Sequence, residues 1–124
     1  LNQGRSILLN TAINKTTTKM ENQTVKVTRS FRNELTASNY FETAKPGYKL
    51  KVSTWKGSRG LTTNFQAMEV KEDSESFLMF SDFSKNIAHP ELKRATEKTI
   101  AQAQVIGLSK IDEVMKEFNL HYNL

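Results

Sequence analysis

Residues 48–71 hold the pattern that most restricts the possible folds, because they predict a β-hairpin. Apolar and β-branched residues alternate there with Lys49, Lys51, Ser53 and Trp55, which is the period of a strand with one buried face. Residues 56–60 (KGSRG) then predict a turn whose two glycines adopt positive φ. The return strand, residues 61–70, breaks its alternation near Met68, which predicts a bulge or burial on both sides.

Three further segments show strand patterns. Residues 5–14 and 76–83 predict a first and a last strand, and residues 23–31 predict one between them. In residues 23–31 we expect Val25, Val27 and Phe31 to face the core, which places Arg29 near a sheet edge or at a bulge.

Two regions show helical spacing instead. Residues 33–44 predict a short helix, with Asn33 as a cap and Leu35, Ser38 and Phe41 on one face. From Pro90 the pattern is helical to residue 118, with a break at Gly107 and a capping box from Ser109 to Asp112. The expected apolar stripes are Leu92, Ala95, Thr99, Ala103 and Ile106 in the first helix, and Ile111, Val114, Met115 and Phe118 in the second.

These elements predict one α+β domain over residues 1–124. Residues 1–88 are expected to be mainly β, with the short helix near residues 34–44, and residues 90–118 to be helical. The predicted architecture is an antiparallel sheet of about five strands with a C-terminal helical pair packed on it. Closure of that sheet into an OB-like barrel is the alternative.

Composition excludes several kinds of chemistry. The chain has no cysteine, which rules out disulfides, thiolate metal sites and a cysteine nucleophile and fits the cytoplasmic location that we expect. No apolar run approaches the ~20 residues of a membrane span, so we expect no membrane partner.

The sequence also lacks the residue patterns of common active sites. His89 and His121 stand far apart without metal-ligand spacing, and we interpret both as solvated residues at the ends of elements. Asp73, Glu75 and Asp82 have no neighbour in sequence that would give them separate acid and base roles. We therefore predict no catalytic residues, no cofactor and no bound metal.

Charge is distributed unevenly along the chain. Residues 1–60 carry eleven Lys or Arg against three acids, whereas residues 61–124 carry seven against ten. A strongly basic half favours a polyanionic partner. The two C-terminal helices do not suit a DNA-binding helix-turn-helix, because Asp112, Glu113 and Glu117 occupy the positions that would meet phosphates.

The basic half and its one tryptophan favour a non-catalytic protein that binds single-stranded DNA or RNA with little sequence preference. Lysines neutralise phosphates, and an exposed indole gives any base a surface for stacking. The predicted nucleic-acid-binding residues are Lys26, Arg32, Lys49, Lys51, Trp55, Lys56 and Arg59. The alternative is a protein-interaction module that forms a homo-oligomer through the C-terminal helices. An exposed Trp55 favours the first hypothesis, and a buried Trp55 favours the second.

Overall fold

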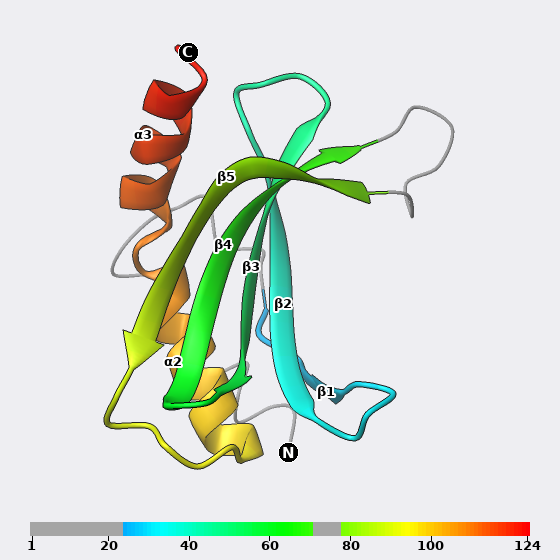
Figure 1. Cartoon of the computed structure of the whole chain (residues 1–124), viewed down its shortest axis with the longest axis vertical. Coiled ribbons are helices and arrows are strands. Elements are labelled where there is room, and N and C mark those ends of the chain that lie inside the picture. The colour runs from blue at the N-terminus through cyan, green and yellow to red at the C-terminus, as the bar shows by residue number, and fades with distance from the viewer. Residues whose placement is uncertain (1–23, 71–77) are drawn as a thin grey trace.

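The computed structural model describes residues 24–70 and 78–124, which form an antiparallel sheet with two helices packed on one face (Figure 1). The elements are β1 (Val27–Arg29), β2 (Leu35–Glu42), β3 (Tyr48–Gly57), β4 (Gly60–Val70), β5 (Leu78–His89), α2 (Glu97–Leu108) and α3 (Ile111–His121). The five strands pair in chain order, and within the described ranges β1 and β5 do not pair with each other. The α+β prediction is confirmed, but the sheet is open, so the alternative of an OB-like barrel is not realised. The strand predicted at residues 5–14 lies outside the described residues.

The predicted hairpin is confirmed as β3 and β4. The two strands pair from Tyr48↔Glu69 to Gly57↔Gly60, which leaves only Ser58 and Arg59 in the turn. Gly60 has a φ of 122°, whereas Gly57 is not in the positive-φ region. The prediction that both glycines adopt positive φ is therefore right for Gly60 and wrong for Gly57. A register shift between Gln66 and Met68 in the β4–β5 pairing confirms the predicted bulge.

Residues 35–42 form strand β2, so the prediction of a helix over residues 33–44 is wrong. The segment also contains a period of two, because buried Ala37, Asn39 and Phe41 alternate with exposed Ser38 and Tyr40. β2 pairs with β3 from residue 37 to residue 42. A short segment with both patterns adopts the one that its neighbour can complete with hydrogen bonds, and here the neighbour is a strand. Asn33 is not a helix cap but a turn residue with a φ of 63°.

Strand β1 is shorter than predicted because the chain turns towards β2 at residue 31. Val25 and Val27 are buried as expected, but Phe31 lies in that turn and is 95% exposed, so its predicted place on the buried face is wrong. Arg29 lies on the edge strand of the sheet, as its position in the pattern predicted.

The last strand continues farther than predicted, and the first described helix starts later. β5 extends to His89, and β4 pairs with it as far as Leu61↔His89. α2 begins at Glu97 rather than at Pro90. Thr96 caps it in a capping box, accepting from the Thr99 N–H while the Thr99 side chain accepts from the Thr96 N–H.

The boundary between the helices also differs from the prediction. α2 continues through Gly107 to Leu108, and the Ser109 hydroxyl donates to the Ile106 carbonyl, so the predicted capping box from Ser109 to Asp112 does not form. Gly107 instead allows close packing: a Cβ added there would lie 2.5 Å from Thr63 Cγ2 on β4. The glycine brings α2 close to the sheet rather than ending the helix.

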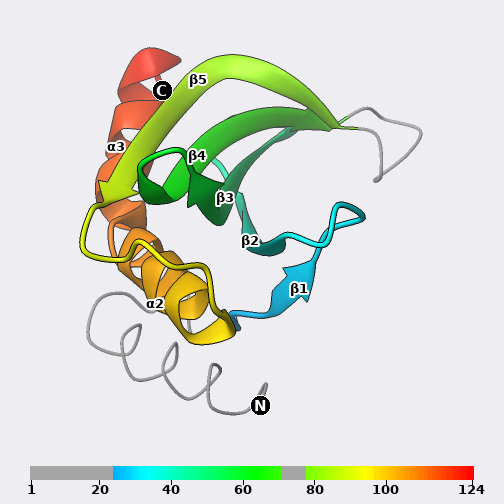
Figure 2. The ribbon, with the colours of Figure 1, turned by 60° about the horizontal axis from the view of Figure 1, so that its bottom comes forward.

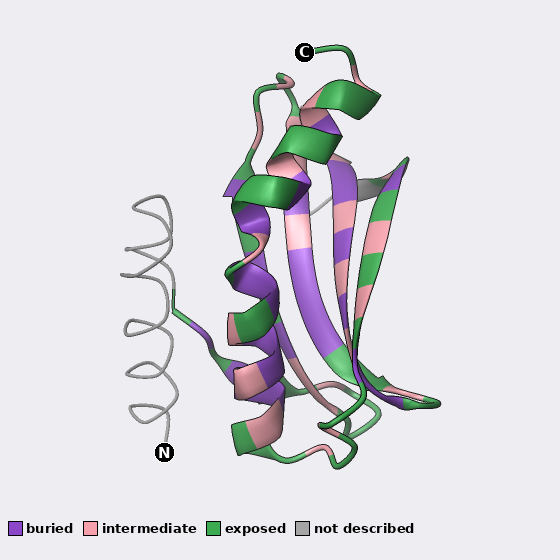
Figure 3. Cartoon of the chain, turned by 90° about the vertical axis from the view of Figure 1, so that its left-hand side faces the viewer, coloured by how far each residue is buried: buried purple, intermediate pink, exposed green. Residues whose placement is uncertain are grey.

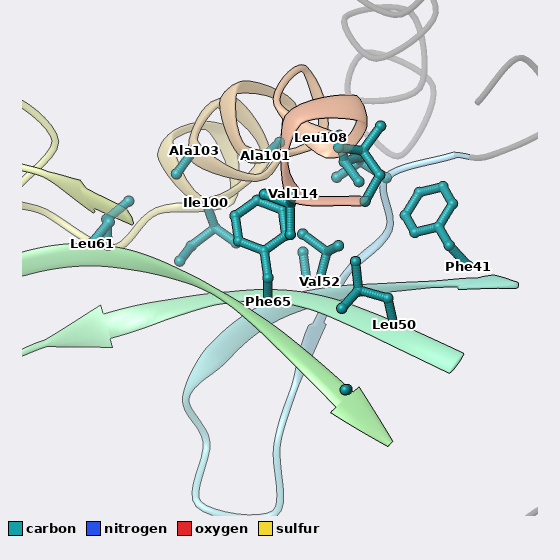
Figure 4. Packing of buried hydrophobic residues seen from close by; sticks show 14 of the residues in the cluster. Phe41, Leu50, Val52, Leu61, Phe65, Ile100, Ala101, Ala103, Leu108 and Val114 are labelled. Atoms are coloured by element: carbon teal, nitrogen blue, oxygen red, sulfur yellow. The ribbon is translucent and has the colours of Figure 1, made fainter. Parts of the chain in front are cut away.

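The core lies between the helices and one face of the sheet. Figure 3 shows buried residues on the sides of α2 and α3 that face the strands, and Figure 4 shows Leu50, Val52 and Phe65 of the sheet packed beneath Ile100 and Val114. The predicted α3 stripe is confirmed, since Ile111, Val114 and Phe118 are buried and Met115 packs against them. In α2 the predicted stripe is displaced: Ile100, Ala101, Ala103, Gln104, Gly107 and Leu108 are buried, whereas Ile106 is exposed.

A buried chain of polar side chains crosses this core. Gln104 on α2 donates from Nε2 to Asn39 Oδ1 and the Val52 carbonyl, so its Oε1 accepts from Thr54 at 2.7 Å. The Thr54 and Thr63 hydroxyl oxygens are 2.6 Å apart, and Thr63 lies 2.8 Å from His89 Nε2. Because the Thr54 hydrogen goes to Gln104, the Thr63 hydroxyl donates its one hydrogen to Thr54 in preference to the Ala103 carbonyl at 3.3 Å, and His89 donates to Thr63 from its Nε2–H.

Candidate nucleic-acid interface

The sheet face turned away from α2 and α3, here called the outer face, is mostly polar. The registers align Ser38, Ser53, Asn64 and Asn86 in one row across β2–β5, and Tyr40, Lys51, Gln66 and Ser84 in the next. Trp55 stands opposite Thr62, one row beyond Ser53 and Asn64. The views in Figures 1 and 2 show that the helices leave this face uncovered.

A groove of about 580 Å³ lies on the outer face and is bounded by the β1–β2 turn. Its lining, which defines the outer groove, includes Lys51, Ser53, Trp55, Asn64, Gln66 and Phe80. Lys51 and Glu34 are its charged lining residues, so the groove carries no net charge of its own. The lining combines neutral polar side chains with the aromatic rings of Trp55 and Phe80.

Aromatic side chains are exposed along this face. Trp55 is 36% exposed and Phe80 is 74% exposed, and both line the outer groove. Tyr40 is 42% exposed beside the groove, and Lys51 Nζ lies 5.9 Å from the centroid of its ring. Phe31, with the Arg32 guanidinium 5.5 Å from its ring centroid, stands outside the groove at the β1–β2 turn.

The structure brings together only part of the predicted site. Of the seven predicted residues, Lys51 and Trp55 line the outer groove. Lys26, Arg32 and Arg59 are exposed on connecting segments. Lys26 precedes β1, Arg32 lies in the β1–β2 turn, and Arg59 lies in the β3–β4 turn.

The remaining two predicted residues lie elsewhere. Lys56 lines a separate hollow of about 320 Å³ with Arg29 and Glu34. Lys49 shares the outer side of β3 with Lys51, but it pairs with Glu42 at 3.5 Å and lines a different groove between the β2–β3 end of the sheet and α3. The seven residues therefore do not form one continuous basic face.

Four residues of the outer face were missed from the sequence: Tyr40, Asn64, Gln66 and Phe80. Tyr40 was missed because its segment was interpreted as a helix. Asn64 and Gln66 alternate with buried Phe65 and Ala67, so the pattern of β4 could have placed them on the outer face. Phe80 lies three positions before buried Phe83, and an odd separation in a strand puts the two side chains on opposite faces. The pattern of β5 could therefore have placed Phe80 on the outer face.

The two histidines have different surroundings. His89 was predicted to be solvated, which is wrong: it ends β5 but is 2% exposed, and burial lowers its pKa below the ordinary value of 6.5. The cause is that the side chain lies among buried groups, since Nε2 is 2.8 Å from the hydroxyl of buried Thr63. Leu92 N–H donates to the His89 carbonyl. His121 is exposed at the end of α3, as predicted.

The C-terminal end of α3 is held to β5 through Asp82. Tyr122 Oη donates to Asp82 Oδ1 at 2.8 Å, His121 Nε2 lies 3.0 Å from Oδ2, and the Ser81 hydroxyl also donates to Oδ1. These bonds, that of Tyr122 first, lower the pKa of Asp82 to about 2, while burial is the main cause that raises the pKa of Tyr122. The cluster fastens α3 to the sheet and does not line the outer groove.

Over the described residues no group of three or more His, Cys, Asp or Glu is placed to hold a metal ion. No helix in residues 24–70 and 78–124 is both long and apolar enough to cross a membrane. Comparison of the chain with family models, with curated protein sequences and with solved structures finds no match.

Proposed function

We propose that this protein binds single-stranded DNA or RNA on the outer face of its sheet, without a chemical step of its own. The observation that carries the proposal is the position of Trp55, which is partly exposed in a groove that also contains Lys51. An indole offers a stacking surface to any base, and an adjacent lysine neutralises a phosphate. A cytoplasmic location belongs to the same proposal, because single-stranded nucleic acids occur inside cells.

Exposed cations on the segments that connect the strands support the proposal. Arg32 and Arg59 are exposed in turns, and Lys26 is exposed before β1. A neutral groove on a protein with such exposed cations suits a strand whose bases enter the groove while its phosphates contact cations outside it. A duplex would need a basic helix or a reading ribbon, and the exposed side of α3 carries Asp112, Glu113 and Glu117.

The alternative, an assembly module built on the C-terminal helices, has weaker support. The apolar stripe of α3 packs against its own sheet and so is not left for a partner. Ile106, Leu120 and Leu124 are the large apolar residues of the described helices and C-terminus that remain exposed. Scattered exposed residues of this kind are common on monomers.

The first prediction tests the proposal by titration with a single-stranded oligonucleotide, followed by tryptophan emission. Trp55 is the only tryptophan in the chain, so its emission reports on the outer groove. We expect quenching by a single strand and less by a duplex of equal charge. Trp55→Ala should weaken binding by about 1–3 kcal/mol, the usual contribution of one stacking aromatic.

The matched control is Phe31→Ala, which also removes an exposed aromatic ring but one outside the groove. It should leave affinity within a factor of about two, since its ring has no place in the proposed contact. Absence of binding to any oligonucleotide at low salt, or an equal effect of the two variants, would refute the proposal.

A further inference from the structure

Two side-chain amides on β4 are hydrogen-bonded to β5. Asn64 Nδ2 donates to Asn86 Oδ1 at 2.8 Å and to the Ser84 hydroxyl at 3.0 Å. Gln66 Nε2 donates to the carbonyls of Ser81 at 2.7 Å, Ala67 at 3.0 Å and Phe83 at 3.2 Å. In both residues the nitrogen is used within the sheet.

The Gln66 amide cannot be reversed without loss. A reversed Gln66 would place its oxygen against three carbonyl oxygens, which cannot donate. A reversed Asn64, by contrast, could accept from the Ser84 hydroxyl and from an Asn86 amide that reverses with it. Gln66 Oε1 has no hydrogen-bond partner among the described residues, and Gln66 lines the outer groove. The groove therefore has one acceptor, Gln66 Oε1, whose orientation is set before any ligand arrives.

We infer that the outer groove selects bases that carry an exocyclic amino group, cytosine and adenine in particular, over uracil and thymine. This inference rests on the proposed binding of single strands. Cytosine presents an N4 amino donor where uracil presents the O4 acceptor. A donor at that ring position can satisfy the fixed acceptor, whereas the O4 acceptor in the same place leaves it unpaired and adds repulsion. Uracil and thymine can donate to it only from N3–H, which requires the ring to shift from that position.

The other polar groups of the groove do not reverse this preference. Lys51 ends in a flexible ammonium. Asn86 is exposed, and because its Oδ1 accepts from Asn64, its Nδ2 lies on the other side of the amide. Both can reach a phosphate or a base carbonyl by small rotations, so they serve all bases alike. Only the fixed acceptor, Gln66 Oε1, distinguishes one base from another.

The test compares oligocytidine and oligouridine single strands of about 12 nucleotides by fluorescence anisotropy of a labelled strand. Length and charge are equal and both bases are pyrimidines, so the comparison isolates the exchange of the amino group for the carbonyl. We expect cytosine strands to bind about five- to tenfold more tightly. N4,N4-dimethylcytosine keeps the ring but loses the donor, and should bind like uracil.

The outcomes separate the two proposals. If neither strand binds, the proposed function fails. If both bind equally, or uracil binds more tightly, this inference is overturned while the proposed function stands. Gln66→Met should move the ratio of the two affinities towards one, whereas Lys51→Gln should weaken both and leave the ratio unchanged. If Gln66→Met does not fold, the dimethylated strand on the unaltered protein decides the question by itself.

Discussion

At the scale of single residues, His89 shows how a buried partner sets the chemistry of a side chain. Its ring donates to Thr63 at the end of the polar chain that runs through Thr54 to Gln104. The neutral imidazole suits that position, and burial disfavours the charged form.

The second prediction follows from this lowered pKa. Because the folded pKa lies below the unfolded value of about 6.5, the unfolded state binds more protons as the pH falls. The contribution of His89 to the free energy of unfolding should be fully present above pH ~6.5. Below that pH the free energy of unfolding should decrease, by at most about 1.4 kcal/mol per pH unit. Urea unfolding at pH values on both sides of this window measures the effect.

The matched control for that experiment uses the exposed histidine. His89→Gln should remove most of the pH dependence in the window, while His121→Gln should retain it. The assignment to His89 fails if the two variants show equal slopes of unfolding free energy against pH.

At the scale of elements, the contact between α2 and β4 depends on a glycine within a helix. Gly107 lies above Thr63, and the space between them does not admit a Cβ. Helix propensity alone would favour alanine by about 1 kcal/mol. Close packing of helix on sheet opposes that preference here.

The third prediction is that Gly107→Ala lowers the free energy of unfolding by about 1–3 kcal/mol, the usual cost of overpacking. Thr63→Ser removes the Cγ2 atom that lies nearest and keeps the hydroxyl of the polar chain. The double variant should therefore recover part of the loss, and a double-mutant cycle by chemical denaturation measures the coupling. A stabilising Gly107→Ala would show that α2 does not approach β4 so closely.

At the scale of the whole molecule, the excess of positive charge is dispersed rather than gathered. Lys51 lies in the outer groove and Lys26, Arg32 and Arg59 are exposed on segments that connect the strands, whereas Lys49 lies in another groove with Glu42. This distribution suits a strand held at a few points rather than one buried in a basic channel.

The fourth prediction concerns the salt dependence of binding. Contact with about three or four phosphates should give a slope of log K against log salt of about −2 to −3. Lys51→Gln should make that slope less steep by about 0.7, the value for one phosphate on a single strand. Lys49→Gln, a change on the same side of the same strand, should leave the slope unaltered because Glu42 already pairs with that lysine. A slope near zero contradicts the proposed electrostatic contacts.

Local patterns in the sequence were enough to determine the β3–β4 hairpin, its bulge, the presence of two C-terminal helices and the apolar stripe of α3. Each depends on neighbours along the chain: alternation places Lys51 and Trp55 opposite Leu50 and Val52, and a spacing of three and four gathers Ile111, Val114 and Phe118. The same alternation placed Trp55 on the outer face, so part of the candidate site followed from sequence alone.

Tertiary structure decided what depends on partners distant in sequence. Residues 35–42 became a strand because β3 offered backbone hydrogen bonds to them, and that pairing placed Tyr40 beside Lys51. Glu42 pairs with Lys49 and leaves Lys51 to the groove, and β5 fixes the amide of Gln66. Sequence periodicity records which side of an element faces the core. It does not record which side chains of other elements meet that residue in space, because pairing and packing between elements set those contacts.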